Sequence, residues 1–310
     1  MIVVPSIELV PNVSEGRSEA VVSEIAAGFA MGNGGALLDR HSDPSHNRSV
    51  LTAVSKADVL LEAVSRLFER ALARIDLNRH RGVHPRIGAV DVLPLVPLGG
   101  FPPQEVMALA NEVGRSVADS FGLPVFLYAD SAVREENREL PRLRRGGFEA
   151  LEARMAASEL VPDFGPKRPH PTGGAVALGA RSLLIAYNVE LRTPDRAAAQ
   201  AIARKIRQSS GGLPHLKALG FELANPARAQ VSMNLTDFQV TSLLTAFDAV
   251  EREAARLGVE VAGSEIVGLI PEAAAFDGMV ERLSLKEAPG ILEERIRERW
   301  RRPATENREL

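Results

Sequence analysis

The feature that most constrains this chain is the order in which strand-like and helix-like segments follow one another in its second half. Apolar and β-branched runs predict strands over 182–189, 216–223 and 229–235, and an interrupted strand over 259–270. Thr193 as the cap, Pro194 at the first helical position and Asp195 in the first turn predict a helix that runs to about Gln208. Thr236–Gln239 predicts a capping box for a helix that Gly258 ends. The order strand–helix–strand–strand–helix–strand is that of the ferredoxin-like fold.

The first half of the chain begins with the same order of segments and adds a helix and a strand. The expected strands are 7–10, 36–39, 48–54, 91–96 and 124–128, and the expected helices are 19–30, 55–76 and 103–121. A charged connection through Pro141 and a short helix over about 148–158 are expected after the last of these strands. We therefore predict an α/β (α+β) protein of two tandem ferredoxin-like βαββαβ subdomains, with a ligand cleft between them. The expected boundaries are 1–180, 181–285 and, for a charged C-terminal helix or tail that contains Trp300, 286–310.

Composition excludes several classes of function. The formal net charge is -3, so the chain lacks the basic excess of a typical nucleic-acid binder. It contains 0 Cys, which excludes disulfides, thiolate zinc sites, iron–sulfur clusters and a cysteine nucleophile. The most apolar stretch, 175–189, is interrupted by polar residues, and no basic leader precedes the apolar N-terminus, so we expect neither a membrane span nor a secretory signal. A cytoplasmic protein is the default expectation.

Polar residues that can do chemistry gather in three connections, 39–48, 79–86 and 163–174, which hold five of the six histidines. In the second connection His80 and His84 have the spacing of a helical metal pair, but Gly82 and Pro85 oppose a helix there. A tight loop that presents His84 beside Arg86 fits better, and a neutral imidazole is a useful general base near pH 7. The alternative is a loop histidine that only hydrogen-bonds backbone.

The other two connections leave more than one interpretation open. His41, Asp43 and His46 could hold a divalent metal; alternatively Arg48, with Asn47, could bind an anion while an acid binds a cation; or the segment is a solvated Asp-Pro turn. The stretch 163–174 carries Lys167, Arg168 and His170 among prolines and glycines. It could close over a ligand, or it could be a linker.

Several motifs resemble a known family in register over about residues 3–275. They are VPNVSEGR at 10–17, HSDPSHNR at 41–48, HRGVHPRIGA at 80–89, DFGP at 163–166, GARSLLIAYNV at 179–189, QVSMNLTDF at 230–238 and GSEIVGLIP at 263–271. They are similar to the formiminotransferase domain of glutamate formimidoyltransferases. The resemblance implies transfer of a formimidoyl group from N-formimidoyl-L-glutamate to N5 of tetrahydrofolate in histidine degradation and one-carbon metabolism, by a homodimer with two α/β subdomains.

The resemblance also assigns roles to residues. The family's catalytic histidine corresponds to His84, and its folate-contacting loop corresponds to ten residues: Gly165, Pro166, Lys167, Arg168, Pro169, His170, Pro171, Thr172, Gly173 and Gly174. Both substrates are acidic, so Arg48, Arg86, Lys167 and Arg168 are the candidate anchors, and Asp39 or Asp43, near His41, could orient His84 or hold the amidinium. Tetrahydrofolate is then a co-substrate, and no metal is expected.

The sequence departs from the family at two motif positions, since Val83 replaces the usual Glu before the histidine and Val13 replaces a Phe. Val83 leaves room for a different acceptor or donor, such as a formyl or formimidoylglycine compound. Two further alternatives stay open: a non-catalytic folate-binding or regulatory paralogue, or a scaffold; and a metal-dependent hydrolase using His41, Asp43 and His46. Because no cyclodeaminase domain follows, we expect no ammonia-releasing step.

Overall fold

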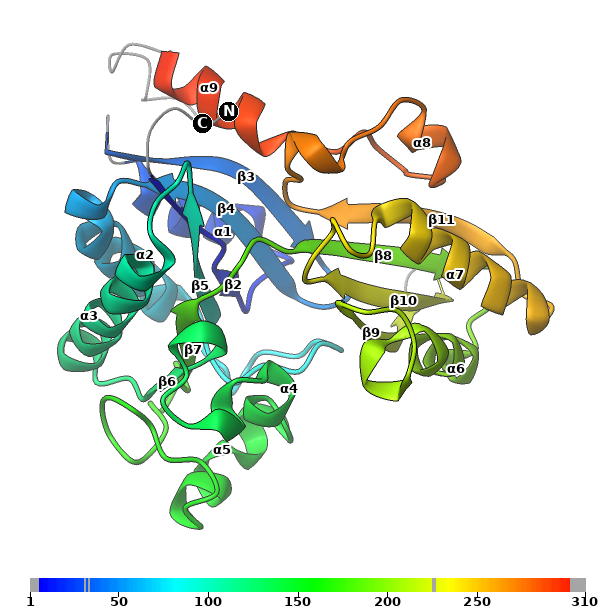
Figure 1. Ribbon diagram of the computed structural model, residues 1–310. Helices are drawn as coiled ribbons and strands as arrows, with labels where there is room; N and C mark the ends of the chain where they lie inside the picture. Colours follow the sequence, from blue (N-terminus) through cyan, green and yellow to red (C-terminus); the bar gives the residue numbers. More distant parts are fainter. Residues whose placement is uncertain (1–5, 31, 33, 225–226, 302–310) are drawn as a thin grey trace. The chain divides into compact units, whose positions relative to one another are not determined.

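The computed structural model describes residues 6–30, 32, 34–224 and 227–301, and it divides into two compact units. One unit runs to Arg181 and includes the chain from Ile296 onwards, and the other runs from Ser182 to Arg295, so that the division falls within α9 (Leu292–Arg301). Figure 1 shows the elements of both units. Of the predicted charged tail, residues 302–310 and the Trp300 side chain lie outside what the structure describes.

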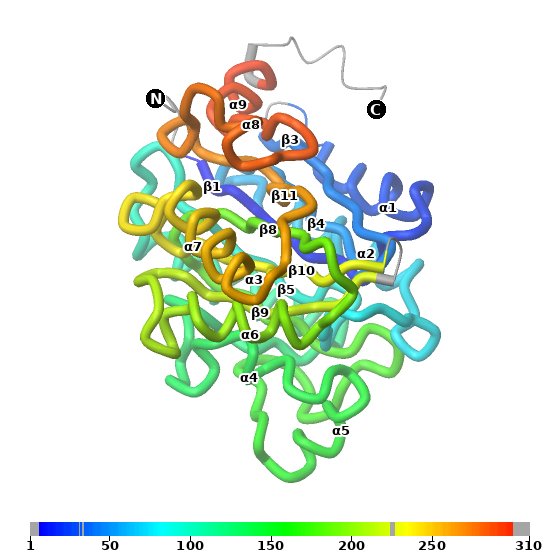
Figure 2. Tube along the Cα trace, turned by 90° about the vertical axis from the view of Figure 1, so that its right-hand side faces the viewer, coloured from blue at the N-terminus to red at the C-terminus, as the bar shows by residue number. Residues whose placement is uncertain are grey.

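The second unit has the ferredoxin-like arrangement that its element order predicts. Its antiparallel sheet has the strand order β11-β8-β10-β9. Helices α6 and α7 cover the same face of this sheet (Figures 1 and 2), where Tyr187, Val231 and Phe247 are among the buried side chains. The elements, in chain order, are β8 (Ile185–Leu191), α6 (Arg196–Ile206), β9 (Leu216–Ala224), β10 (Ala227–Leu235), α7 (Leu243–Arg256), β11 (Val261–Val267) and the short α8 (Met279–Arg282).

Two predicted helix starts in this unit are wrong in detail. Helix α6 is capped by Asp195, whose carboxylate accepts a hydrogen bond from the Ala197 N–H, and not by Thr193. Helix α7 begins at Leu243 with Ser242 as its cap, several residues after the expected capping box at Thr236. The Thr236 hydroxyl donates to the His215 carbonyl instead, so it is not used for a helix terminus.

The first unit repeats the same order and extends it. In its sheet β3 pairs with β4, and β1 and β2 follow one another end to end between β4 and β5; β7 and then β6 complete the order beyond β5. Together, β1 and β2 correspond to the first strand of the ferredoxin-like order. The elements are β1 (Ser6–Leu9), β2 (Asn12–Val13), α1 (Glu19–Ala26), β3 (Gly35–Asp43), β4 (Arg48–Ser55), α2 (Leu60–Arg74), β5 (Val90–Leu98), α3 (Pro103–Phe121), β6 (Val125–Leu127), α4 (Leu140–Leu143), α5 (Gly147–Ala156) and β7 (Val176–Ala180). The predicted tandem α+β fold is confirmed, whereas the ligand cleft between the subdomains stays a prediction.

The β5–β7–β6 part of this sheet is covered on both faces. Val125 and Leu127 point into the core formed with α2 and α3, while Phe126 and Tyr128 point into a second cluster with Leu143 and side chains of α5. This alternation follows from the period of two along a strand. Strand β7 is parallel to both β5 and β6, and the sequence did not predict it.

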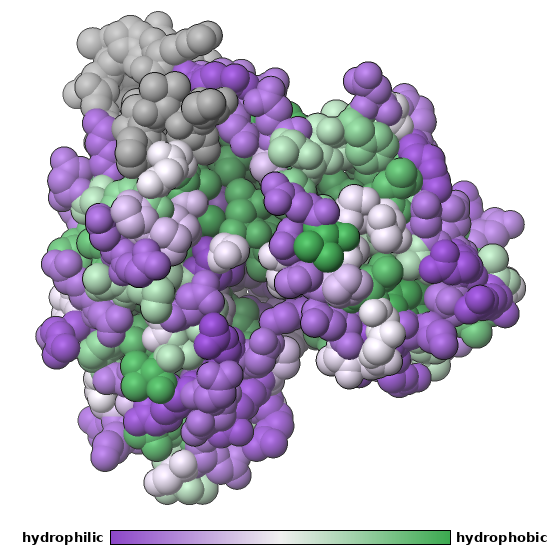
Figure 3. Space-filling model, in the orientation of Figure 1, coloured by the Kyte–Doolittle hydropathy of each residue, from purple (hydrophilic) through white to green (hydrophobic). Residues whose placement is uncertain are grey.

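The first polar connection is shorter than expected. Strand β3 runs to Asp43 and β4 begins at Arg48, so His41 and Asp43 lie on a strand and only a tight turn remains between the two. Hydrophilic side chains cover most of the face drawn in Figure 3. Within the described ranges, every helix is too short or too polar to span a bilayer.

Candidate active site

His84 lies in the loop between α2 and β5, which forms no helix, as Gly82 and Pro85 predict. Its Nε2 lies 2.6 Å from Nη1 of Arg48, and its Nδ1 lies 2.8 Å from the carbonyl oxygen of Pro85. Because a guanidinium can only donate, Nε2 must accept, and Nδ1 must carry the proton that is donated to Pro85. The contacts therefore define a neutral imidazole with its lone pair on Nε2.

The surroundings keep this imidazole neutral. Burial lowers the pKa of His84 well below its ordinary value of 6.5, and the positive charges of Arg48 and Arg144 lower it further. Burial, with the charge of Arg144, also lowers the pKa of Arg48 to about 10. At pH 7 the pair is therefore a neutral base beside a cation.

The two arginines near His84 differ in their partners. Nε and Nη2 of Arg144 both bind Oδ2 of the buried Asp91, at 2.8 and 2.5 Å, and Oδ1 of Asp91 accepts from the Ile87 N–H. Arg48 forms no ion pair with any residue that the structure describes. A partly buried guanidinium without a carboxylate is suited to bind an anionic ligand.

Asn47, the residue before Arg48, forms hydrogen bonds with two other segments, those that contain Gly16 and residues 80–81. Its Oδ1 accepts from the Gly16 N–H at 3.0 Å, its Nδ2 donates to the Arg81 carbonyl at 3.0 Å, and its own carbonyl oxygen lies 2.7 Å from Nε2 of His80. Its φ of 49° is in the left-handed region, which Asn tolerates better than most residues. The side chain thus fixes the loop that carries His84 against the turn that precedes Arg48.

The close approach of these two segments also depends on Gly82. A Cβ at that position would lie 2.1 Å from the His46 carbonyl oxygen, which no side chain could accommodate without a backbone shift. Gly82 is therefore needed for space.

Asp43 and His46 form a second polar pair at the turn. Oδ1 of Asp43 accepts from the N–H groups of Ser45 and His46, and its Oδ2 lies 3.2 Å from Nδ1 of His46. The ring of His46 lies 5.6 Å from the ring of His84, centroid to centroid. Asp39 and His41 are half-buried on β3. Among the described residues, no group of three or more histidines or acids is arranged to hold a metal ion.

Arg86, a predicted substrate anchor, contacts protein groups. Its guanidinium forms two hydrogen bonds with Glu149, of 2.7 and 2.8 Å, and its Nε donates to Nδ1 of His80. These contacts join α5 to the loop of His84. Its predicted role as a substrate anchor stays untested.

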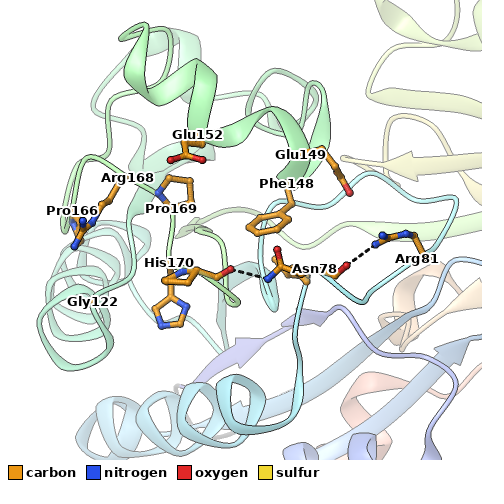
Figure 4. Close-up of a pocket in the computed structure, with 12 residues that line it drawn as sticks. Asn78, Arg81, Gly122, Phe148, Glu149, Glu152, Pro166, Arg168, Pro169 and His170 are labelled. Atoms are coloured by element: carbon orange, nitrogen blue, oxygen red, sulfur yellow. Dashed lines mark hydrogen bonds between the residues drawn. The ribbon is translucent and has the colours of Figure 1, made fainter.

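A cavity of about 960 Å³ lies in the first unit, beside this loop. Arg81 and Arg168 stand on opposite sides of it, with Phe148 between them (Figure 4). Five residues of the predicted folate loop are among those that line it: Leu77, Asn78, Arg81, Gly122, Phe148, Glu149, Glu152, Pro166, Arg168, Pro169, His170 and Pro171. The other five, Gly165, Lys167, Thr172, Gly173 and Gly174, are not in the lining.

The end of the loop is held by backbone contacts. His170 and Gly174 exchange backbone hydrogen bonds of 2.8 and 3.0 Å, and Nδ1 of His170 accepts from the Gly173 N–H. Gly174 has a φ of 68°, and a Cβ there would lie 2.0 Å from the Ile87 carbonyl oxygen. The glycines therefore position the lining.

The sequence does not identify several residues near the site. It predicts that Asp91 belongs to an apolar strand, that Arg144 belongs to a charged connection and that Glu149 belongs to a short helix. The only signal for Arg144 was its place among three arginines within residues 142–145, a pattern that is equally typical of a solvated surface.

Comparison with known proteins decides the family. Residues 6–181 match the formiminotransferase domain, N-terminal subdomain, and residues 186–295 match the formiminotransferase domain. The chain belongs to the formiminotransferase family.

Relatives at high coverage agree with this membership. The chain is 41% identical over 271 residues to a glutamate formimidoyltransferase of Streptococcus pyogenes serotype M1, an alignment of 87% of this chain and 91% of that one. It is 40% identical over 273 residues to a glutamate formimidoyltransferase of Thermoplasma acidophilum, with 87% and 90% covered. A formimidoyltransferase-cyclodeaminase of Sus scrofa is 39% identical over 277 residues, which are 87% of this chain and 51% of that one.

Proposed function

We propose that this formiminotransferase-family protein is an enzyme that transfers a formimidoyl group from N-formimidoyl-L-glutamate to N5 of tetrahydrofolate. The products are 5-formimidoyltetrahydrofolate and glutamate, in histidine degradation and one-carbon metabolism. The observation that carries the proposal is the neutral His84 in contact with Arg48, a cation without a carboxylate partner among the described residues. Its relatives named glutamate formimidoyltransferase support the choice of substrates.

The reaction needs a proton to move, and His84 is suited to move it. The lone pair of N5 attacks the amidine carbon, a C–N bond forms, and the C=N electron pair goes to nitrogen. The adduct carries a surplus proton on N5, which Nε2 of His84 accepts and then delivers to the glutamate nitrogen. The nitrogen lone pair re-forms the C=N bond as the C–N bond to glutamate breaks, and the glutamate nitrogen leaves with that bond's electron pair. The imidazole ends in the state in which it began.

The site offers groups for both substrates. We assign the donor's carboxylate to Arg48, and the amidinium to Asp39 or Asp43 on β3, with His41 nearby. We assign tetrahydrofolate to the cavity, where Phe148 can stack on an aromatic ring and Arg168, helped by Lys167, can bind the acidic tail. Val83, 47% exposed beside His84, stands where the family carries Glu, so the donor must be tested directly.

The test is turnover with formimidoylglutamate and tetrahydrofolate, followed by the absorbance of the 5-formimidoyl product. His84→Asn should lower kcat by about 10²–10⁴ while tetrahydrofolate binding is retained. His215→Asn, in the second unit, is the matched control and should be active. Near-normal turnover of His84→Asn refutes the assignment.

The same assay separates the alternatives. Turnover only with a formyl or formimidoylglycine donor would identify a different substrate, and folate binding without any turnover would identify a non-catalytic paralogue. We further propose a cytoplasmic homodimer that binds neither nucleic acid nor membrane, and light scattering after gel filtration tests the dimer.

A further inference from the structure

No carboxylate of the described residues forms an ion pair with Arg48, and the charges of Asp91 and Asp43 act on it only from a greater distance. The nearest acids are already engaged, since Asp91 is bound by Arg144 and by the Ile87 N–H, and Asp43 is bound by the turn and by His46. The one side-chain hydrogen bond that Arg48 forms with the described residues goes to His84. A carboxylate would be a stronger partner for a guanidinium than a neutral imidazole is.

The same contact occupies the atom that the reaction needs. Nε2 holds the lone pair of His84, and at 2.6 Å it accepts a hydrogen bond from Arg48. A lone pair used in this way is not available to a proton on N5. In the state described here, the candidate base is therefore masked.

We propose that the donor's carboxylate unmasks the base by drawing the Arg48 guanidinium away from Nε2 of His84. This inference rests on the proposed function and specifies the order of two steps in it. Proton transfer to His84 becomes possible only after an anionic donor is bound. Tetrahydrofolate bound alone, or with a donor that lacks carboxylates, meets a histidine whose lone pair is occupied.

The charged groups around His84 agree with this direction. Arg48 at the start of β4, Arg144 after α4 and His46 in the turn all disfavour a protonated His84, whereas Asp91 on β5 and Asp43 on β3 are held by other partners. A bound carboxylate would neutralise Arg48 and leave Arg144 paired with Asp91. The pKa of His84 should therefore rise when the donor site is filled.

The experiment is an NMR titration of the full-length protein labelled with ¹³C-histidine, with glutarate as the probe because it has both carboxylates and no reacting nitrogen. The His84 signal is assigned with His84→Gln. Saturating glutarate should raise the pKa of His84 by about 1 or more, and sodium chloride of equal ionic strength should not. In Arg48→Gln the pKa should already be raised without ligand and should not respond to glutarate.

Arg40→Gln is the matched control, because Arg40 lies on the neighbouring strand and pairs with Glu19. It should respond to glutarate as the unmodified protein does. A pKa of His84 that glutarate leaves unchanged, or that is as low in Arg48→Gln as in the unmodified protein, overturns the proposal.

A kinetic test uses formamidine, a donor without carboxylates. Glutarate added in trans should increase formimidoyl transfer from formamidine at least several-fold in the unmodified protein and not in Arg48→Gln. Equal stimulation of both proteins, or of neither, contradicts unmasking. Transfer from formimidoylglutamate, measured on the same preparation, tests the proposed function independently.

Discussion

The hydrogen bonds of His84 with Arg48 and with the Pro85 carbonyl determine which nitrogen of the imidazole is protonated. The contact with Arg48 also makes the pKa of His84 depend on what else Arg48 binds. In the proposed function the neutral form of His84 is the active one, so we expect activity to be lost as the pH falls through the pKa of His84. The pKa in the donor-free protein is well below 6.5.

The pH dependence of the two rate parameters should therefore differ. With the donor varied at saturating tetrahydrofolate, kcat/KM reports the donor-free enzyme and kcat reports the donor-bound enzyme. As the pH is lowered, kcat/KM should stay constant until a pH well below 6.5 is reached. The value of kcat should begin to decrease at a higher pH than kcat/KM does. Rate measurements from pH 4.5 to 8 check this, and coincident acid limbs would contradict it.

Asn47 combines an unusual backbone conformation with two side-chain hydrogen bonds. Asn47→Gly keeps the conformation and loses both bonds, which should lower the free energy of unfolding by about 1–3 kcal/mol. Asn47→Ala should lose about 1–2 kcal/mol more, because a left-handed φ is strained for Ala. Urea denaturation measures the free energy of unfolding of both variants. Equal values for the two would contradict the expectation that a left-handed φ destabilises the Ala variant.

At the scale of elements, the sequence predicted what depends on local patterns. The strand–helix order of the second unit and the loop around His84 follow from apolar runs and from Gly82 and Pro85. Strand β7 was missed because its small residues, VALGA, follow a Pro/Gly-rich stretch and its partners are distant in sequence. The pairing of Asp91 with Arg144 is likewise a contact over 53 residues, which no local pattern contains.

The contact between α5 and the loop of His84 should respond to acid. Hydrogen bonding to Arg86 lowers the pKa of Glu149 from its ordinary 4.5 to about 2, so its contribution to stability is present above 4.5 and is lost as the pH falls towards 2. Glu149→Gln should therefore be less stable than the unmodified protein at pH 7, and the difference should shrink below pH 4.5. Denaturant titrations at several pH values measure this, with Glu105→Gln on α3 as the control; a difference independent of pH would contradict it.

At the scale of the whole molecule, we expect a reaction that needs no metal. The carboxylate of Asp43 accepts hydrogen bonds from its turn and lies 3.2 Å from His46, and no group of three or more histidines or acids among the described residues is arranged to hold a metal ion. Dialysis against EDTA should leave the rate of formimidoyl transfer unchanged. A loss of activity that zinc or magnesium restores would favour the metal-dependent alternative.

The sheet partner of strand β6 lies far downstream of it in the sequence. Strand β6 pairs with β7, which begins at Val176, and Val125 also bridges Phe164; both partners are made after β6 itself. While the protein emerges from the ribosome, β6 therefore exposes unpaired backbone groups until residue 180 has been synthesised, and such an edge can join other nascent chains. The lining of the cavity is drawn from segments between Leu77 and Pro171, so a nascent chain cut short before β7 would contain every lining residue but would lack the strand that joins β5 to β6.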